Sequence, residues 1–228
     1  MFAGVFAENF LVQAAVRGEP GLRECALALV DGAPPLTKVV AVSEAARRVG
    51  VAIGMPKATA AQFVGVEIRA RSLALEKSAH AALLDLGWSI SPRIEDTSAD
   101  TMVVDVAGLG SIFGDEEAIA DELLERGRAC GLQLNVAVAA NIGTALVAAR
   151  GIAGACVIVR GEEADDIEQW LNREFESPAK EPFQKVLADK ELTGGDWEIL
   201  VRFLASQIVR TPAFLIKSHA GIRWRPRC

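Results

Sequence analysis

Apolar and polar residues recur along this chain with two different periods, which together predict a mixture of strands and helices. Short runs that are apolar, or that alternate apolar and polar residues, predict strands at 2–7, 25–30, 38–42, 66–70, 134–139 and 155–159 and a pair of strands within 94–107. Apolar residues three or four positions apart predict helices at 10–16, 44–49, 56–63, 74–88, 116–130 and 141–150. Turn residues such as Asp31-Gly32 separate these segments.

The order of these elements favours an α+β fold. After residue 73, strands occur both in adjacent pairs and in alternation with helices, which fits a mainly antiparallel sheet with helices packed on one face. Strand patterns stop near residue 161 and charged residues become more frequent. We therefore expect a first domain at 1–160 and a helical C-terminal segment of unknown role at 161–228.

Composition narrows the function classes. The chain has 228 residues, 51% of them hydrophobic, and a formal net charge of −6, which argues against a large nucleic-acid footprint. Its four cysteines are widely spaced and it has two histidines, so no zinc-ligand spacing is present and reduced thiols are expected. We find neither a signal-peptide pattern nor an apolar run long enough for a membrane span, and expect a cytoplasmic protein.

The predicted hairpin at 94–107 is the most informative segment because it carries several carboxylates. Glu95, Asp96, Asp100 and Asp105 stand where two short strands could present them on one face or at one edge. Carboxylate oxygens are the ligands that hard divalent cations require. Acidic ligands on such a hairpin hold the two magnesium ions of palm-type nucleotidyltransferases.

Several blocks of the sequence resemble the Y-family, or UmuC-type, translesion DNA polymerases. The block GAPPLTKVVAVSEAARRVGVAIGMP (32–56) is similar to the family's finger-region signature, and VAVAANIGTALVAARG (136–151) to its later palm strand and helix. Phe10, Gln13 and the segment 19–23 match its first helix and the following turn. The resemblance covers about residues 1–160. It implies a ferredoxin-like palm sheet into which a small fingers region, about residues 10–72, is inserted.

The metal ligands of that family are largely replaced here. By the resemblance, Phe6 and Thr101 occupy the positions of two metal carboxylates, and Asp100 is the residual one. Glu8, two residues beyond Phe6, is a candidate substitute if the register shifts. Arg47 matches a nucleotide-binding arginine of the family, whereas Glu44 stands where the family has a tyrosine. We therefore expect no catalytic residues, no bound metal and no cofactor.

The resemblance is strongest to the non-catalytic ImuB-like branch, through residues 91–93 and 105–114. It implies an accessory protein of damage-induced (SOS) translesion synthesis and mutagenesis. The implied partners are an error-prone replicative-type DNA polymerase subunit and a RecA-like protein, with weak DNA contact at most and no membrane.

Two alternatives remain open. One is an active DNA-directed nucleotidyltransferase that holds Mg²⁺ with Glu8, Asp100 and either Glu95 or Asp96. The other is a chimaeric or truncated chain without independent function, because the C-terminal part departs from the family. That part is similar, through FLASQIVRTP (203–212), to a helical bacterial domain of unknown function.

Overall fold

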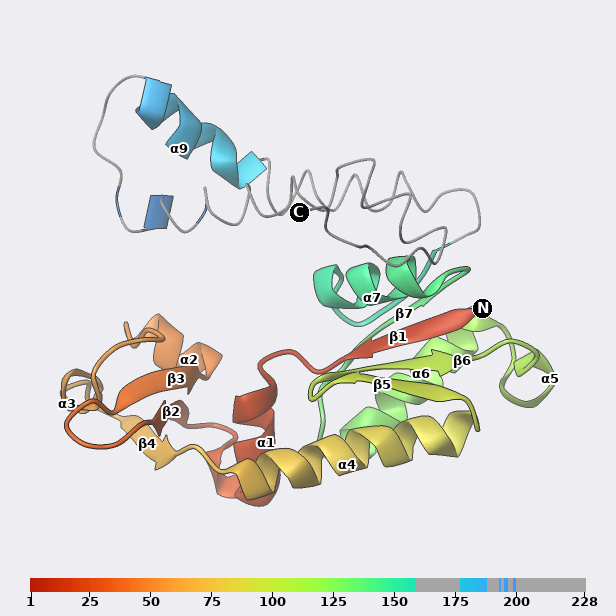
Figure 1. The fold of residues 1–228 in the computed structure, drawn as a ribbon, viewed down its shortest axis with the longest axis horizontal. Coiled ribbons are helices and arrows are strands. Elements are labelled where there is room, and N and C mark those ends of the chain that lie inside the picture. Colours follow the sequence, from red (N-terminus) through yellow and green to blue (C-terminus); the bar gives the residue numbers. More distant parts are fainter. Residues whose placement is uncertain (159–176, 188–192, 194, 197–198, 200–228) are drawn as a thin grey trace, which may run out of the picture. The chain divides into compact units, whose positions relative to one another are not determined.

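A computed structural model describes residues 1–158, 177–187, 193, 195–196 and 199. The chain divides into two compact units, Met1–Ile158 and Val159–Cys228. The first unit contains two sheets, and all strands described below belong to it (Figure 1).

The larger sheet has five strands in the order β5-β6-β1-β7-β8 (Figure 1). Strand β1 lies in its middle and is antiparallel to both neighbours, whereas β7 and β8 are parallel. The bounds are Phe2–Phe6 for β1, Ile94–Ser98 for β5, Thr101–Asp105 for β6, Asn135–Ala139 for β7 and Ala155–Val157 for β8. The continuous buried runs of β1, β6 and β7 reflect a sheet covered on both faces.

Two long helices cover one face of this sheet. Helix α4 (Leu73–Ile90) and helix α6 (Glu116–Ala129) pack against a core to which β1 contributes Ala3 and Val5. Both helices begin with a capping side chain, because Ser72 and Asp115 accept hydrogen bonds from the third backbone N–H that follows. The short helix α5 (Gly110–Phe113) precedes α6.

Helix α7 (Ile142–Gly151) lies on the opposite face. Its alanines pack with Phe2 and Phe6, the β1 residues that point away from α4 and α6. Gly4 lies between them, and a Cβ at this position would be 2.6 Å from the carbonyl carbon of Ala145. The α+β fold class is confirmed: the expected layer of helices corresponds to α4 and α6, and the structure adds α7 on the other face.

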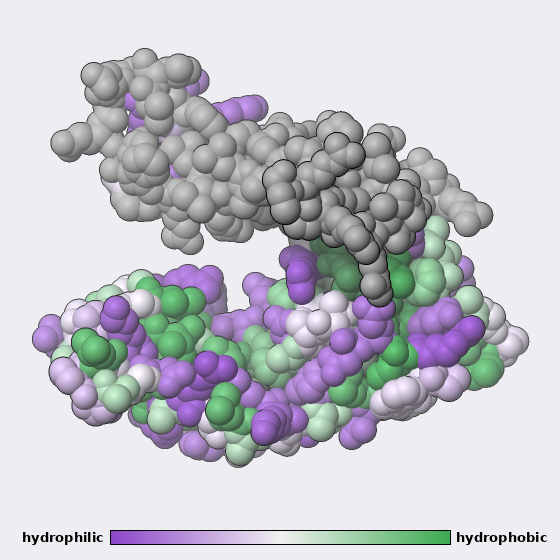
Figure 2. Space-filling view, in the orientation of Figure 1, coloured by the Kyte–Doolittle hydropathy of each residue, from purple (hydrophilic) through white to green (hydrophobic). Residues whose placement is uncertain are grey.

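The second sheet is smaller and has the strand order β3-β2-β4. Its strands are β2 (Ala26–Asp31), β3 (Lys38–Val42) and β4 (Val66–Ala70), and helices α2 (Glu44–Arg48) and α3 (Lys57–Ala60) follow β3. They share a core of their own, centred on Val30, Val39 and Val51. We call residues 26–70 the small subdomain. Its surface mixes charged side chains with exposed apolar ones such as Ile53 and Val64 (Figure 2).

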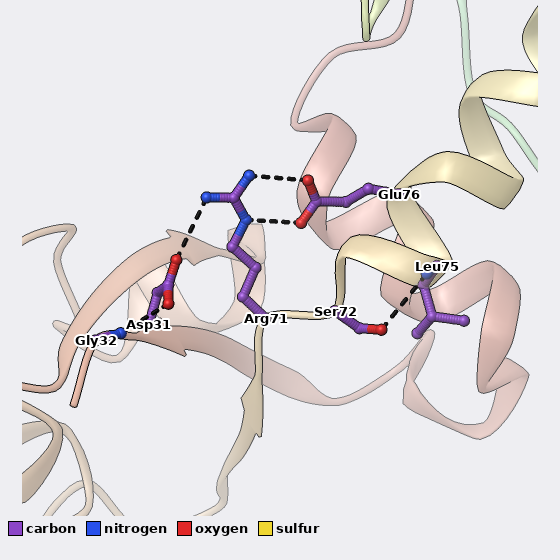
Figure 3. Close-up of polar contacts among 6 residues, drawn as sticks. All are labelled: Asp31, Gly32, Arg71, Ser72, Leu75 and Glu76. Carbon is purple, nitrogen blue, oxygen red and sulfur yellow. Dashed lines mark hydrogen bonds and ion pairs between the residues drawn. The ribbon is translucent and has the colours of Figure 1, made fainter. Parts of the chain in front are cut away.

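Helix α1 (Phe10–Gly18) and the short helix η1 (Pro20–Leu22) lead from β1 into the small subdomain, and the chain returns to the large sheet through Arg71. The Arg71 guanidinium donates two hydrogen bonds to the Glu76 carboxylate in the first turn of α4, at 2.7 and 2.9 Å. It also donates to Asp31 at the end of β2, at 3.3 Å (Figure 3). These contacts, of which the hydrogen bonds to Glu76 have the largest effect, raise the pKa of Arg71 above its ordinary value. Arg71 thus ties the connection to helix α4 of the large sheet and to strand β2 of the small subdomain.

In the second unit the structure describes helix α9 (Ser177–Leu187). Pro178 lies in the first turn of this helix, where proline is tolerated, and Pro182 lies inside it. The remaining helical expectations for 161–228 lie outside the described residues. Among the described helices, none is long and apolar enough to cross a membrane.

Candidate functional site

Phe6 and Thr101, the residues expected to replace two metal carboxylates, lie directly opposite each other. They form the last pair of the antiparallel ladder between β1 and β6. Because paired residues point to the same face, both side chains lie on the α7 side of the sheet. Thr101 is fully buried and Phe6 is half-buried. The sequence therefore places both residues at one point of the fold, and neither supplies a carboxylate there.

Asp100 precedes Thr101 in the tight turn between β5 and β6. Its Oδ1 accepts hydrogen bonds from the hydroxyls of Ser98 at 2.7 Å and Thr101 at 2.8 Å. Its backbone carbonyl accepts a hydrogen bond from the Ala7 N–H at 2.8 Å. The residual carboxylate is thus held by two neighbouring hydroxyls and fixes the end of β1 against the turn.

Arg150, near the end of α7, completes this group. Its Nη2 donates a hydrogen bond to Thr101 Oγ1 at 3.2 Å, and its Cζ lies 5.7 Å from the centroid of the Phe6 ring. Since the Thr101 hydroxyl donates its hydrogen to Asp100, its oxygen is free to accept from the guanidinium. We call Phe6, Asp100, Thr101 and Arg150 the arginine cluster.

The arginine cluster does not fit a pair of divalent cations. Two-metal catalysis needs oxygen ligands that hold two ions about 4 Å apart. Here a phenyl ring and a buried hydroxyl take the place of two carboxylates, and a guanidinium already faces both. Throughout the part of the chain that the structure describes, no three His, Cys, Asp or Glu side chains are grouped so as to hold a metal ion.

The alternative ligand set of Glu8, Asp100 and either Glu95 or Asp96 is not assembled either. Strand β1 ends at Phe6, so Glu8 does not continue its face and lies exposed in the following turn. Asp96 lies opposite Met102, on the α4 side of the sheet, and its Oδ2 is 3.1 Å from His80 Nε2. Glu95 is exposed on the edge strand. In this geometry these residues do not come together as the ligand set that the first alternative requires.

Arg47 lies on α2, in the small subdomain, beside a cleft of about 400 Å³. Glu8 and Glu44 line the same cleft. Arg47 is exposed, and its Nη1 is 3.5 Å from Glu44 Oε2. Ser43 caps α2 by accepting a hydrogen bond from the Ala46 N–H at 3.2 Å. The cleft thus has two carboxylates and one arginine on its walls.

The sequence gives no sign of the role of Arg150. An arginine in the last turn of a helix is ordinarily explained by the helix dipole. Its contacts with Phe6 and Thr101 arise only because α7 crosses the sheet above β1; Thr101 is 49 positions away in the sequence and Phe6 is more distant still.

The two sheets, with helices on both faces of the larger one, have the fold of the palm and fingers domains of Y-family DNA polymerases. The chain belongs to the impB/mucB/samB family, which it matches over residues 5–150. This membership relates the chain to DNA-damage bypass. Residues 127–223 also match a second family, described as a protein of unknown function (DUF4238), which supplies no activity.

Solved structures of similar fold agree with this membership. The chain is 21% identical to the Dbh DNA polymerase of a post-insertion binary complex, with a TM-score of 0.63, covering 72% of this chain and 50% of that one. It is 18% identical to DinB from Sulfolobus solfataricus, with a TM-score of 0.62, covering 90% and 67%. The chain thus spans half the length of the first of these polymerases. The comparison with curated proteins gives no match.

Proposed function

We propose that this chain is a non-catalytic, polymerase-like accessory protein of translesion synthesis. The observation that carries the proposal is the arginine cluster, in which Arg150 contacts the two residues that stand in carboxylate positions. A cation built into the fold takes the place that the family resemblance gives to metal ions.

The charges of the arginine cluster support the proposal that this site does not bind catalytic metal ions. Two unit charges 4 Å apart interact with about 4 kcal/mol near a protein surface, so a divalent ion beside the guanidinium would be repelled strongly. Asp100 is the single carboxylate of the cluster, and its Oδ1 already accepts two hydrogen bonds. It cannot offset that repulsion for two metal ions.

The accessory role follows the ImuB-like resemblance of residues 91–93 and 105–114. In this role the palm and fingers serve as a scaffold in the cytoplasm during the SOS response. The partners would be an error-prone replicative-type polymerase subunit and a RecA-like protein, with weak DNA contact at most. Arg47, exposed beside its cleft, is the residue through which a residual phosphate contact would be made.

A primer-extension assay tests the central claim. The purified chain is incubated with primed template, the four deoxynucleotides and either Mg²⁺ or Mn²⁺, next to the variant Asp100→Ala. We expect no template-dependent addition, and the same background from both proteins. Extension by the unmodified chain that exceeds the Asp100→Ala background would make this chain an enzyme and end the proposal.

A further inference from the structure

A second concave surface lies between α1 and the C-terminal part of α6. It is a groove of about 600 Å³, and it shares no residue with the arginine cluster. Val12 and Val16 of α1 line one side, Leu124 and Arg128 of α6 another, and Arg23 and the segment 131–134 also contribute. A pocket of this size is in the range that holds a drug-sized ligand or a few side chains.

The two walls of this groove are tied together by polar contacts. Gln13 of α1 donates to the Gln133 carbonyl at 2.8 Å and accepts from the Gln133 N–H at 2.6 Å. Arg17, one turn further along α1, donates to the Cys130 carbonyl at 2.9 Å. Because these bonds join α1 to the chain that follows α6, the groove is formed before any ligand arrives, which lowers the entropic cost of binding.

The charged side chains that line the groove itself are both positive, and the neighbouring cleft with Glu8 and Glu44 shares four lining residues with it. Arg23 and Arg128 both line the groove, and no carboxylate does. Within the described residues, Arg69, Arg71 and Arg126 all form ion pairs, whereas the guanidinium groups of Arg23 and Arg128 form neither ion pairs nor hydrogen bonds. Two uncompensated cations in a chain of net charge −6 make this groove a local site for negative charge.

We propose that this groove binds an acidic, aliphatic peptide segment of a partner protein. The aliphatic side chain of that segment would lie against Val16 and Leu124, and flanking carboxylates would pair with Arg23 and Arg128. A nucleic acid fits less well, because single strands are bound by stacking bases on aromatic side chains and none lines the groove. Two cations also fall short of the roughly 6–10 phosphate contacts of a typical DNA-binding protein.

This inference does not depend on the proposal that the palm lacks polymerase activity. A chain that extends primers could still bind the peptide, and an inactive chain could fail to bind it. The two experiments therefore give independent answers.

Two labelled peptides of equal length provide the test. One is Gly-Asp-Glu-Leu-Leu-Glu-Gly, and in the other lysine replaces the three acidic residues. Fluorescence anisotropy at low salt measures their binding to the full chain, to the double variant Arg23→Glu/Arg128→Glu and to the control Arg48→Glu/Arg93→Glu. The control changes the net charge equally at two exposed arginines outside the groove.

We expect the acidic peptide to bind the unmodified chain about tenfold more tightly than the lysine peptide, as two exposed charge pairs allow. The Arg23→Glu/Arg128→Glu variant should reverse this preference, and the control should keep it. Methyl NMR should show shifts at Val12, Val16 and Leu124 with the acidic peptide.

Three outcomes would overturn the proposal. They are equal binding of both peptides, an equal effect of the two double variants, and methyl shifts that leave the groove unaffected. A thymidine oligonucleotide of the same charge is the further probe, and tighter binding of it, lost in the groove variant, would assign the groove to nucleic acid instead. Thermal melting shows that each variant is folded.

Discussion

Arg150 donates a hydrogen bond to the hydroxyl of Thr101 and thereby joins helix α7 to strand β6. Thr101 is fully buried and donates in turn to Asp100, so a guanidinium, a hydroxyl and a carboxylate form one chain of hydrogen bonds. The Phe6 ring lies beside the guanidinium. At the positions that the family resemblance assigns to metal carboxylates, α7 and β6 are in contact through these side chains.

If this contact is structural, Arg150→Ala should destabilise the first unit. The variant loses one hydrogen bond and one cation–π contact, which together are worth about 1–2 kcal/mol. Arg48→Ala serves as the control, because Arg48 is 76% exposed and its loss should change stability by less than about 0.5 kcal/mol. Urea denaturation followed by circular dichroism measures the free energy of unfolding of both variants. Equal losses would show that the contacts of Arg150 do not stabilise the first unit.

Gly4→Ala should be more disruptive than its size suggests. The added methyl group would meet the backbone of Ala145, so α7 must move away from the sheet. Forcing an extra carbon into a packed contact costs about 1–3 kcal/mol. At Gly21 a Cβ has no neighbour within 4 Å, so Gly21→Ala should leave the midpoint of thermal unfolding nearly unchanged. A Gly4→Ala protein as stable as the control would mean that α7 packs less closely than described.

Arg71→Lys should loosen the return connection from the small subdomain. A lysine cannot reproduce the paired hydrogen bonds to Glu76 and also reach Asp31 (Figure 3). We expect a loss of about 1 kcal/mol in the free energy of unfolding. Hydrogen exchange at the start of α4 should accelerate as well. Arg47→Lys, at an exposed arginine with one longer ion pair, should show neither effect.

Asp196 in the second unit should give a pH-dependent contribution to stability. Hydrogen bonds from Thr193 and then Lys185 lower the pKa of this buried carboxyl from 3.8 to about 2. Because the folded-state pKa is depressed, its stabilising contribution is complete above pH 4 and is lost as the pH falls through about 2. A carboxyl NMR titration, assigned with Asp196→Asn, measures this pKa. A midpoint near 3.8 would show that these contacts do not form.

Local sequence patterns predicted most elements because their causes are local. Strand β3 has the expected bounds, and the helix expected at 74–88 is α4, Leu73–Ile90. The cap of α2 is equally local, because the Ser43 hydroxyl accepts a hydrogen bond from the Ala46 N–H within one turn. Phe6 lies opposite Thr101, whereas the replacement of two metal carboxylates by these residues stays a prediction.

Contacts that depend on how elements cross could not be predicted. Asp96 is exposed, and its contact with His80 arises because α4 runs along that face of the sheet. Arg150 gave no sequence signal of its contact with Thr101, because that contact requires α7 to cross the other face. In both cases tertiary packing determines which residue the side chain contacts, and local sequence patterns do not carry that information.

The central position of β1 has a consequence for how the chain folds during synthesis. Phe2–Phe6 pairs with Thr101–Asp105 and with Asn135–Ala139, so this strand has no sheet partner until about a hundred further residues have been made. Until then its apolar side chains have no native sheet to cover them, and the nascent chain presents an unpaired strand to chaperones and to other chains. The large sheet therefore forms late in synthesis, and β7 and then β8 are the last strands that join it.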